Sequence, residues 1–353
     1  MDFTFESHQL AFRDAIRKFL VVEAAPEMLR DIWETQSGRS AELRAKLADQ
    51  GLTALSVPED FGGIEMGDLD WVLVQQELGY YAIPDSLIDT AYLGAGIIRD
   101  LSSDIERKRE WLPRIADGSA RVAVGHPINP FVADAGTADL LLMWHEDAVH
   151  ALRPDEVELT AQPSIDMSRR LFSVAWEPSE ANRIANARLG AQLWADTCDR
   201  AALAVSAQLV GLAQRMLDLG VDYAAQRKQF GKPIGSFQAV KHHLADVQVA
   251  IDFAAPVVHR AAYALAHDQS LRGRAIAQAR LQASEAARKA ARASIQVHGA
   301  MGYTWEADLQ MFMKRAWVLD AAWGDVPHFK ARLAEDIFAD GAALGPSATF
   351  ETT

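Results

Sequence analysis

A basic loop is the first stretch of this sequence whose residue types suggest chemistry. The segment Tyr223–Gln238 gathers positive charge around Arg227 at the point where one helix is expected to end and another to begin. A guanidinium and the free N–H groups of a helix N-terminus together hold phosphate groups well. Phe230, in the same loop, is placed to lie against an aromatic ring. Taken alone, a solvated basic turn is the simpler interpretation.

A glycine-containing segment, Gln296–Glu306, follows further along the chain. Gly299 and Gly302 interrupt a helical pattern there and permit a close approach of the backbone to a ligand. By itself this spacing also fits an ordinary turn between two helices. The two segments on neighbouring helices are far more specific together than either one is alone.

Long helices are predicted to position both segments. Apolar residues step by three and four over 205–223 and again over 237–251. A third stretch, 274–297, holds nine alanines between positions 275 and 293, which favours helix and close helix–helix contact. A fourth helix is expected to begin near Glu306. Four antiparallel helices would bury these stripes as a bundle.

The chain before the bundle divides into a helical part and a part rich in short strands. A helical stripe opens the sequence, and the segment GLTALSVPEDFGG, 51–63, is expected to be a loop with fixed turns. Four short apolar runs then predict strands, at 121–124, 139–144, 148–152 and 171–176. The predicted fold is therefore mainly α with a small β domain. Its parts are a helical domain at 1–120, a reduced β domain at 121–185, a four-helix bundle at 186–345 and a tail at 346–353.

Composition excludes several function classes. The net charge of −13 over 353 residues argues against a nucleic-acid partner, because binding a phosphate backbone needs clustered Lys and Arg. No apolar run reaches the length needed to cross a bilayer, and the N-terminal residues do not form a signal-peptide pattern. Cys198 is the only cysteine, so no disulfide framework and no cysteine metal site is expected. We expect a cytoplasmic protein without a metal.

The motifs resemble those of a known family. R-x-Q-F-G followed by F-Q, and then Q-x-x-G-x-x-G-Y-x-x-E, resemble the C-terminal bundle of the acyl-CoA dehydrogenases. The loop GLTALSVPEDFGG is similar to a hallmark of the family's N-terminal domain. The order of helical domain, β domain and bundle is also the same over essentially the whole chain.

The resemblance implies a flavoprotein that oxidises an acyl-CoA thioester to its α,β-enoyl form. A carboxylate would remove the α-proton while the β-hydrogen leaves as hydride to FAD. In this family FAD lies across a subunit interface, with its adenine half held by the neighbouring subunit's bundle. By position, the residues that would hold the neighbour's FAD are Arg227, Phe230, Gln238, Gln296, Val297, His298, Gly299 and Ala300.

The family's catalytic positions are altered in this chain. Counting from Gln296, the common glutamate base falls on Trp323, which has no group to accept a proton. An alternative family position for the base, on the first bundle helix, falls on Gln208, an amide that takes up no proton at neutral pH. The arginine that would bind the CoA chain falls on Ala202, although the nearby Arg200 is a possible substitute.

The loop that would hold the flavin edge is also changed. The family's T-E-P-x-x-G-S-D corresponds here to VGHPINPFVAD, 124–134, which keeps Pro127 but has Gly125 and His126 in place of Thr and Glu. No Gly-Ser-Asp follows. His126 is a possible base, because its pKa range suits proton transfer, but it is also interpretable as an ordinary hydrogen-bonded side chain.

The losses affect this chain's own flavin and substrate, whereas the residues directed at a neighbour's FAD are kept. The leading hypothesis is therefore the non-catalytic subunit of a two-chain α2β2 acyl-CoA dehydrogenase from lipid or steroid degradation. It would need a catalytic acyl-CoA dehydrogenase subunit, an acyl-CoA at the shared site and an electron-acceptor flavoprotein. One alternative is a self-sufficient homo-oligomer that uses Asp199, Asp320 or Asp325 as its base. A second is a flavin-free scaffold, and a third is another flavin reaction on the same fold.

Overall fold

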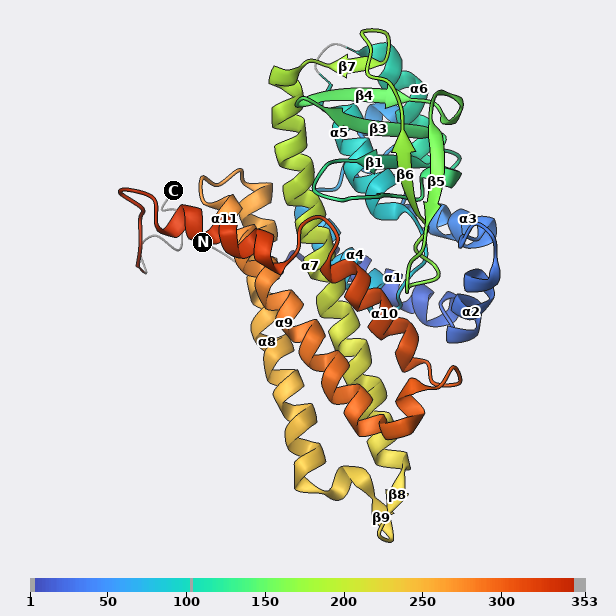
Figure 1. Ribbon diagram of the computed structural model, residues 1–353, viewed down its shortest axis with the longest axis vertical. Helices are drawn as coiled ribbons and strands as arrows, with labels where there is room; N and C mark the ends of the chain where they lie inside the picture. The colour runs from blue at the N-terminus through green and yellow to red at the C-terminus, as the bar shows by residue number, and fades with distance from the viewer. Residues whose placement is uncertain (1–3, 102–103, 346–353) are drawn as a thin grey trace. The chain divides into compact units, whose positions relative to one another are not determined.

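The computed structural model describes residues 4–101 and 104–345, which fall into two compact units. The bundle unit comprises residues 4–10, 72–82 and 202–345, and the sheet unit comprises residues 11–71, 83–101 and 104–201. The elements are mostly helices, with two small sheets and a short hairpin (Figure 1). The prediction of a mainly α fold with a small β domain is confirmed.

Long helices build the bundle unit. Running through it are α7 (Ala187–Gln226), whose first residues belong to the sheet unit, α8 (Gln238–Ala266), α9 (Arg272–His298) and α10 (Leu309–Asp320). The predicted alanine-rich stretch lies within α9, where eight alanines are buried, and this small-residue face allows α8 to pack closely along its length (Figure 1). The apolar periodicity therefore located the bundle helices correctly.

The last predicted helix is in fact two helices. After α10 the chain turns at Trp323 and Gly324, which have φ values of 54° and 94°, and restarts as α11 (Val326–Ile337). Asp325 caps the new helix by accepting a hydrogen bond from the His328 N–H at 2.9 Å, and Pro327 occupies its first turn. Left-handed backbone followed by a cap and a proline ends one helix and starts another, which the apolar pattern alone does not reveal.

The sheet unit begins with helices α1 (Ser7–Glu23), α2 (Pro26–Glu34), α3 (Ala41–Asp49) and the start of α4 (Asp68–Tyr80). The predicted loop at 51–63 is a series of turns that includes the 3₁₀ turn η1 (Glu59–Phe61). A π-helix, η2 (Ile88–Gly94), follows and continues into α5 (Ala95–Arg99) and then α6 (Ile105–Ala116). Gly94 lets η2 pack on the first strand, since an added Cβ would lie 2.7 Å from a Val122 methyl group.

Two small sheets complete this unit. The four-stranded sheet has the order β1 (Val122–Gly125), β3 (Leu140–His145), β4 (Ala148–Leu152) and β7 (Arg183–Ala185), with β1 parallel to β3. The three-stranded sheet has the order β2 (Val132–Ala133), β6 (Leu171–Ala175) and β5 (Glu158–Gln162). Leu141 and Leu152 lie in the core of this unit, and the partly buried Phe172 of the three-stranded sheet packs against it.

The four predicted strands correspond to β1, β3, β4 and β6, each within about one residue. The strands that the sequence missed have weak signals. β2 and β7 are two and three residues long, and β5, with the sequence ELTAQ, is a largely exposed strand without an apolar run.

Candidate functional site

The two motif segments meet at one end of the bundle unit. The hairpin of β8 (Lys228–Gln229) and β9 (Lys232–Pro233) follows α7, and the 3₁₀ segment η6 (Gly299–Tyr303) follows α9 (Figure 1). Tyr223 near the end of α7 stacks on His298 at the end of α9, with ring centroids 4.3 Å apart and an interplanar angle of 21°. This stacked pair joins the segments, although about seventy-five residues separate them in the sequence.

The hairpin presents an aromatic side chain in a strained turn. Phe230 and Gly231 form its tip with φ values of 54° and 78°, the left-handed pair of a type I′ turn. Glycine or asparagine normally occupies such positions, and another residue costs about 1–2 kcal/mol there. Phe230 is nonetheless 91% exposed, and its ring meets the Phe237 ring edge-on, with centroids 6.1 Å apart. A large apolar group held in strain and in solvent is available to an external partner.

Cationic groups flank this aromatic tip. Arg227 is exposed just beyond α7, and its guanidinium makes no ion pair with any residue that the structure describes. Lys232 lies over the ring of Phe237, with Nζ 4.5 Å from the centroid. Gln238 is the exposed first residue of α8, and its N-cap, Phe237, offers no side-chain acceptor to the first N–H groups. An arginine beside an uncapped helix N-terminus suits a phosphate or pyrophosphate.

The second segment offers backbone at close range. Gln296, Gly299 and Ala300 are exposed, while Val297 and His298 are partly buried. Gly299 ends α9 with φ 60° and ψ −139°, a conformation open essentially to glycine alone, so the glycine serves the backbone turn. His298 Nδ1 lies 2.8 Å from the Ser294 carbonyl oxygen, and burial lowers the pKa of the His298 ring. The eight residues assigned to FAD from the sequence therefore lie directly after α7, on the hairpin, at the start of α8, or across the end of α9 and the start of η6.

Trp323 occupies a rigid turn. Its side chain is 4% exposed, and the turn around it is organised by Arg280 of α9, which is fully buried. The Arg280 guanidinium donates to the carbonyls of Leu319, Asp320, Ala322 and Gly324, at 2.8–3.4 Å. These bonds fix the backbone of the turn independently of the side chain at position 323.

The carboxylates near Trp323 have structural partners. Asp320 accepts from Arg280 at 3.4 Å and from Arg288 at 2.7 Å. Asp325 caps α11, as described above. The third alternative base, Asp199, is buried within the sheet unit at 4% exposure. Using Asp320 or Asp325 as a base would break an ion pair or a helix cap.

Gln208 lies where α4 and α7 cross inside the bundle unit. The crossing is close, since a Cβ on Gly79 would overlap the Gln208 backbone at 2.3 Å. Gln208 is buried and donates to the Gln75 side-chain oxygen at 2.7 Å. The Gln75 amide nitrogen has no hydrogen-bond partner among the residues that the structure describes. This amide pair supplies no proton acceptor of useful basicity.

Arg200 is engaged elsewhere in the sheet unit. Its guanidinium lies 3.5 Å from Asp68 and 3.7 Å from Asp100, and its side chain is mostly buried. Ala202, at the family's arginine position, is fully buried. Arg200 would have to leave two carboxylates to bind a CoA chain, so the structure does not support it as a substitute.

His126 is packed within the sheet unit. Its ring lies 5.3 Å from that of Trp194 and 5.9 Å from that of Trp144, and its Nδ1 is 3.9 Å from Cys198 Sγ. Nδ1 accepts a hydrogen bond from the Ile128 N–H at 3.2 Å. Burial lowers the pKa of His126 to about 4, so the imidazole is a poor proton acceptor at neutral pH. In the loop at 124–134, which differs from the family pattern, His126 is therefore a neutral side chain packed against tryptophan rings.

A titratable group that the sequence reading missed lies on η2. Asp89 is half-buried, and burial raises the pKa of its carboxyl to about 7, aided by the Asp134 carboxylate and opposed by Arg169 and Arg39. Asp134 itself pairs with Arg39 at 2.5 Å. The sequence gives no sign of this, because Asp89 reads as an ordinary helical acid. In the described ranges, no group of three or more His, Cys, Asp or Glu side chains is placed to hold a metal.

Comparison with known proteins gives concordant sequence matches. Residues 6–119 match the family description "Acyl-CoA dehydrogenase, N-terminal domain", and residues 190–325 match "Acyl-CoA dehydrogenase, C-terminal domain". The chain is 33% identical over 306 residues to acyl-CoA dehydrogenase IpdE2 of Mycolicibacterium smegmatis, covering 86% of this chain and 90% of that protein. It is 32% identical to IpdE2 of Mycobacterium tuberculosis, covering 86% and 89%.

Solved structures share the fold. A chain of the ChsE4–ChsE5 complex from Mycobacterium tuberculosis superposes with a TM-score of 0.86 at 23% identity, covering 96% of this chain and 99% of that one. Butyryl-CoA dehydrogenase from Megasphaera elsdenii gives a TM-score of 0.85 at 21% identity, covering 96% and 100%.

Proposed function

The chain belongs to the acyl-CoA dehydrogenase family, and from this premise we propose that it is the non-catalytic subunit of a two-chain enzyme. Members of the family are oxidoreductases that act on acyl-CoA thioesters with FAD as cofactor. In the proposed enzyme this chain contacts the FAD of a catalytic relative, and the relative supplies the glutamate base. The chain would thus complete an active site without performing the proton transfer.

The proposal rests on a contrast between the positions proposed to contact FAD, which are exposed, and the family's positions for the base, which are buried. Phe230, Arg227 and the Gly299 turn are exposed at one end of the bundle unit. At the family's positions for the base, by contrast, stand a buried tryptophan and a buried amide, Trp323 and Gln208. A chain that had simply lost its function would be expected to lose both sets alike. A chain that keeps the exposed FAD-contacting residues but has no base suits a subunit that contributes to the active site of a neighbouring subunit.

The residues present fit one half of FAD. When bound, the cofactor accepts the hydride that leaves the β-carbon of the acyl-CoA. The end of the bundle unit that carries the hairpin fits the adenine and pyrophosphate half of FAD. Arg227 and the α8 N-terminus can hold the phosphates, and Phe230 can stack on the adenine ring. The flavin-side loop around His126 lacks the family's Thr, Glu and Gly-Ser-Asp, and aromatic rings pack against that histidine. We therefore assign to this chain the adenine half of a neighbour's FAD and not a flavin of its own.

The proposed assembly is an α2β2 heterotetramer with a catalytic acyl-CoA dehydrogenase subunit. The similarity to a chain of the two-component ChsE4–ChsE5 complex supports this arrangement. A site shared by two chains suits a bulky acyl-CoA, such as one derived from a lipid or a steroid. Electrons would leave to an acceptor flavoprotein, as in the family at large, and we place the enzyme in the cytoplasm.

The test is to purify the chain alone and together with an acyl-CoA dehydrogenase that carries the glutamate base and whose gene adjoins that of this chain. Flavin absorbance and enoyl-CoA formation are then measured for both preparations. We expect little flavin and no enoyl-CoA from the lone chain, and both from the complex. Full flavin occupancy with enoyl-CoA formation by the lone chain would overturn the proposal in favour of a self-sufficient enzyme. A complex that lacks FAD would favour a scaffold.

A further inference from the structure

The last turn of α7 connects the bundle to the loop proposed to contact FAD. Arg227 directly follows this turn, and its N–H donates to the Tyr223 carbonyl oxygen at 2.9 Å. The Arg227 carbonyl oxygen in turn accepts a hydrogen bond from the Ile234 N–H at 2.8 Å, which closes the base of the hairpin. The way in which α7 ends therefore sets where Arg227 and the hairpin lie.

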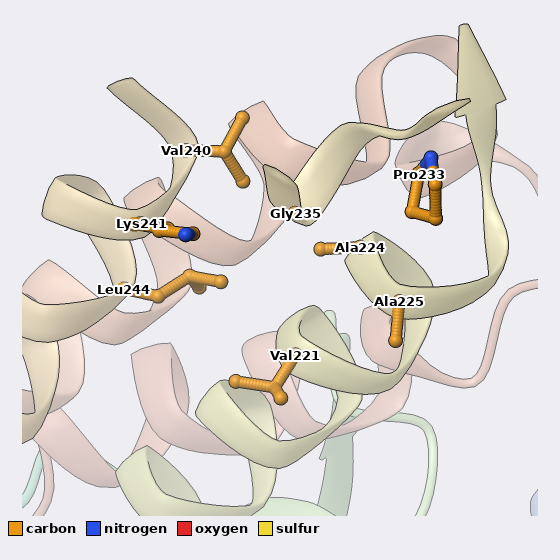
Figure 2. Close-up of a pocket in the computed structure, with 8 residues that line it drawn as sticks. All are labelled: Val221, Ala224, Ala225, Pro233, Gly235, Val240, Lys241 and Leu244. Atoms are coloured by element: carbon orange, nitrogen blue, oxygen red, sulfur yellow. The ribbon is translucent and has the colours of Figure 1, made fainter. Parts of the chain in front are cut away.

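The strap that leads from the hairpin to α8, residues 232–237, covers one face of this turn. It runs close to α7, since a Cβ on Gly235 would lie 3.1 Å from the Ala224 carbonyl oxygen. The same face of α7, with Val221, Ala224 and Ala225, lines an apolar groove of about 530 Å³ that the strap and the first turns of α8 complete (Figure 2). Because the groove leaves this face incompletely packed, the strap alone holds the turn weakly.

Tyr223 holds the opposite face of the turn. Successive residues of an α-helix are rotated by about 100°, which places Tyr223 about 150° away from the face that lines the groove. Its ring stacks on the ring of His298, with centroids 4.3 Å apart and an interplanar angle of 21°. The stack joins the last turn of α7 to the last turn of α9.

The His298 ring is a fixed support for this stack. Its Nδ1 lies 2.8 Å from the Ser294 carbonyl oxygen, and since a carbonyl only accepts hydrogen bonds, Nδ1 carries the proton. Ser294 is buried and tied to α7, because its hydroxyl donates to the Met216 carbonyl oxygen at 2.7 Å. A Cβ on Gly220 would lie 3.2 Å from the Ser294 hydroxyl oxygen, so the two helices are close here. The imidazole therefore cannot shift without disturbing the contact between α7 and α9.

The two rings stand directly before the two segments proposed to contact FAD. Arg227 follows Tyr223 by one helical turn, and Gly299 is the residue after His298. The segment after Gly299 also returns to this histidine, since a Cβ on Gly302 would lie 3.1 Å from the His298 Cβ. A change in the stack would thus move the hairpin and the Gly299 turn relative to each other.

On the basis of the proposed function, we propose that Tyr223 is a positioning residue for the neighbour's FAD. Through its stack on His298 it holds the Arg227 loop and the Gly299 turn in one arrangement, and it does not contact FAD itself. Two segments that are already in place lose less conformational freedom on binding than two that move independently. Because an aromatic pair changes an equilibrium constant by a factor of about two to twelve, FAD binding should depend on the stack to a similar extent.

The test compares replacements of Tyr223 with a matched control. Tyr223→Leu and Tyr223→Met remove the stack, whereas Tyr223→Phe keeps the ring and removes only the hydroxyl. Tyr263→Leu is the control, because Tyr263 stacks on His267 at the end of α8, with centroids 4.0 Å apart and an interplanar angle of 24°, and this pair joins none of the segments proposed to contact FAD. The Kd for FAD is measured in the complex with the catalytic subunit, and urea denaturation of each lone chain measures fold stability.

We expect the Kd for FAD to rise about three- to tenfold in Tyr223→Leu and Tyr223→Met. Tyr223→Phe should retain most of the affinity, because it retains the stack. Tyr263→Leu should lower the stability of the fold and leave the Kd for FAD unchanged. An unchanged Kd in both Tyr223→Leu and Tyr223→Met would overturn the positioning role. The role would also be overturned if Tyr223→Phe bound FAD as weakly as Tyr223→Leu, because the hydroxyl would then contact the cofactor.

A double-mutant cycle tests whether Tyr223 acts through His298. In a chain that already carries His298→Leu, the stack is absent, so adding Tyr223→Leu should raise the Kd for FAD little further. Full additivity of the two changes would show independent contributions and would contradict the proposal.

Failure of the positioning role is distinguishable from failure of the proposed function. Phe230→Ala tests the proposed function, since Phe230 is proposed to contact FAD directly. If Phe230→Ala weakens FAD binding in the complex and Tyr223→Leu does not, the FAD role stands and the positioning role is rejected. If neither change alters the Kd for FAD, this end of the bundle unit does not hold the cofactor and both proposals are rejected.

Discussion

Phe230→Gly tests whether Phe230 contributes to FAD binding and not to the stability of the fold. The residue sits at φ 54° with 91% of its surface exposed. Replacing Phe230 with glycine relieves about 1–2 kcal/mol of backbone strain at this left-handed position. Glycine costs about 0.5–1 kcal/mol through the greater freedom of the unfolded chain. The lone chain should therefore be as stable as the wild type or more stable by up to about 1.5 kcal/mol.

The same change should weaken FAD binding in the assembled enzyme. Stacking of a base on an aromatic side chain contributes about 1–3 kcal/mol, so losing it should raise the Kd for FAD by about fivefold to 150-fold. The assays are urea denaturation of the lone chain and release of FAD fluorescence from the complex. Phe338→Gly, which removes another exposed phenylalanine, at the end of α11, is the control and should not affect FAD. Unchanged FAD affinity in Phe230→Gly, or a clear loss of fold stability, would refute the reasoning.

Three further changes test the internal groups. The raised pKa of Asp89, about 7 against an ordinary 3.8, means that the unfolded chain ionises first, so this group reduces stability as pH rises from about 4 to 7. Asp89→Asn should therefore stabilise the chain at pH 8 by about 2 kcal/mol. This is roughly half the free energy that the pKa difference would give, because the carboxyl is partly exposed. The gain should be smaller at pH 5, and denaturation at both pH values measures it. Arg280→Met leaves several carbonyls and Asp320 with fewer donors and should cost about 3 kcal/mol, while the emission of the buried Trp323 shifts to the red. Trp323→Glu should give no enoyl-CoA in the lone chain and should lower its melting temperature; activity in this variant would contradict the proposed role.

Helical periodicity predicted most of the fold because the bundle helices are long. Over a helix such as α8, twenty-nine residues long, a stripe of three-and-four spacing is unambiguous. Short elements carry too few residues for any pattern, which is why β2 and β7 were missed. The division of the last helix at Trp323 depends on left-handed backbone, which becomes visible only in the folded chain.

The candidate site was predictable where motifs are local and unpredictable where contacts are distant. The hairpin and the Gly299 turn are continuous in sequence, so their spacing revealed them. The Tyr223–His298 stacking and the Arg280 bonds join residues roughly forty to seventy-five positions apart and depend on helix packing. The raised pKa of Asp89 likewise arises from burial on η2, which no pattern in the sequence encodes.

The partners of the acidic groups explain why one substitution should not restore catalysis. Arg280 and Arg288 hold Asp320, the cap of α11 holds Asp325, and the turn between them is fixed by bonds that do not involve the side chain at position 323. A glutamate at position 323 would thus enter a well-formed turn, yet the neutral His126 would still stand in a loop without the family's flavin-side residues. Under the proposed function, a base in such a chain would have no flavin of its own to receive the hydride. On this proposal, the changed flavin-side loop explains why a tryptophan can stand at position 323, and the exposed hairpin is the part of the chain that acts in catalysis by the neighbour.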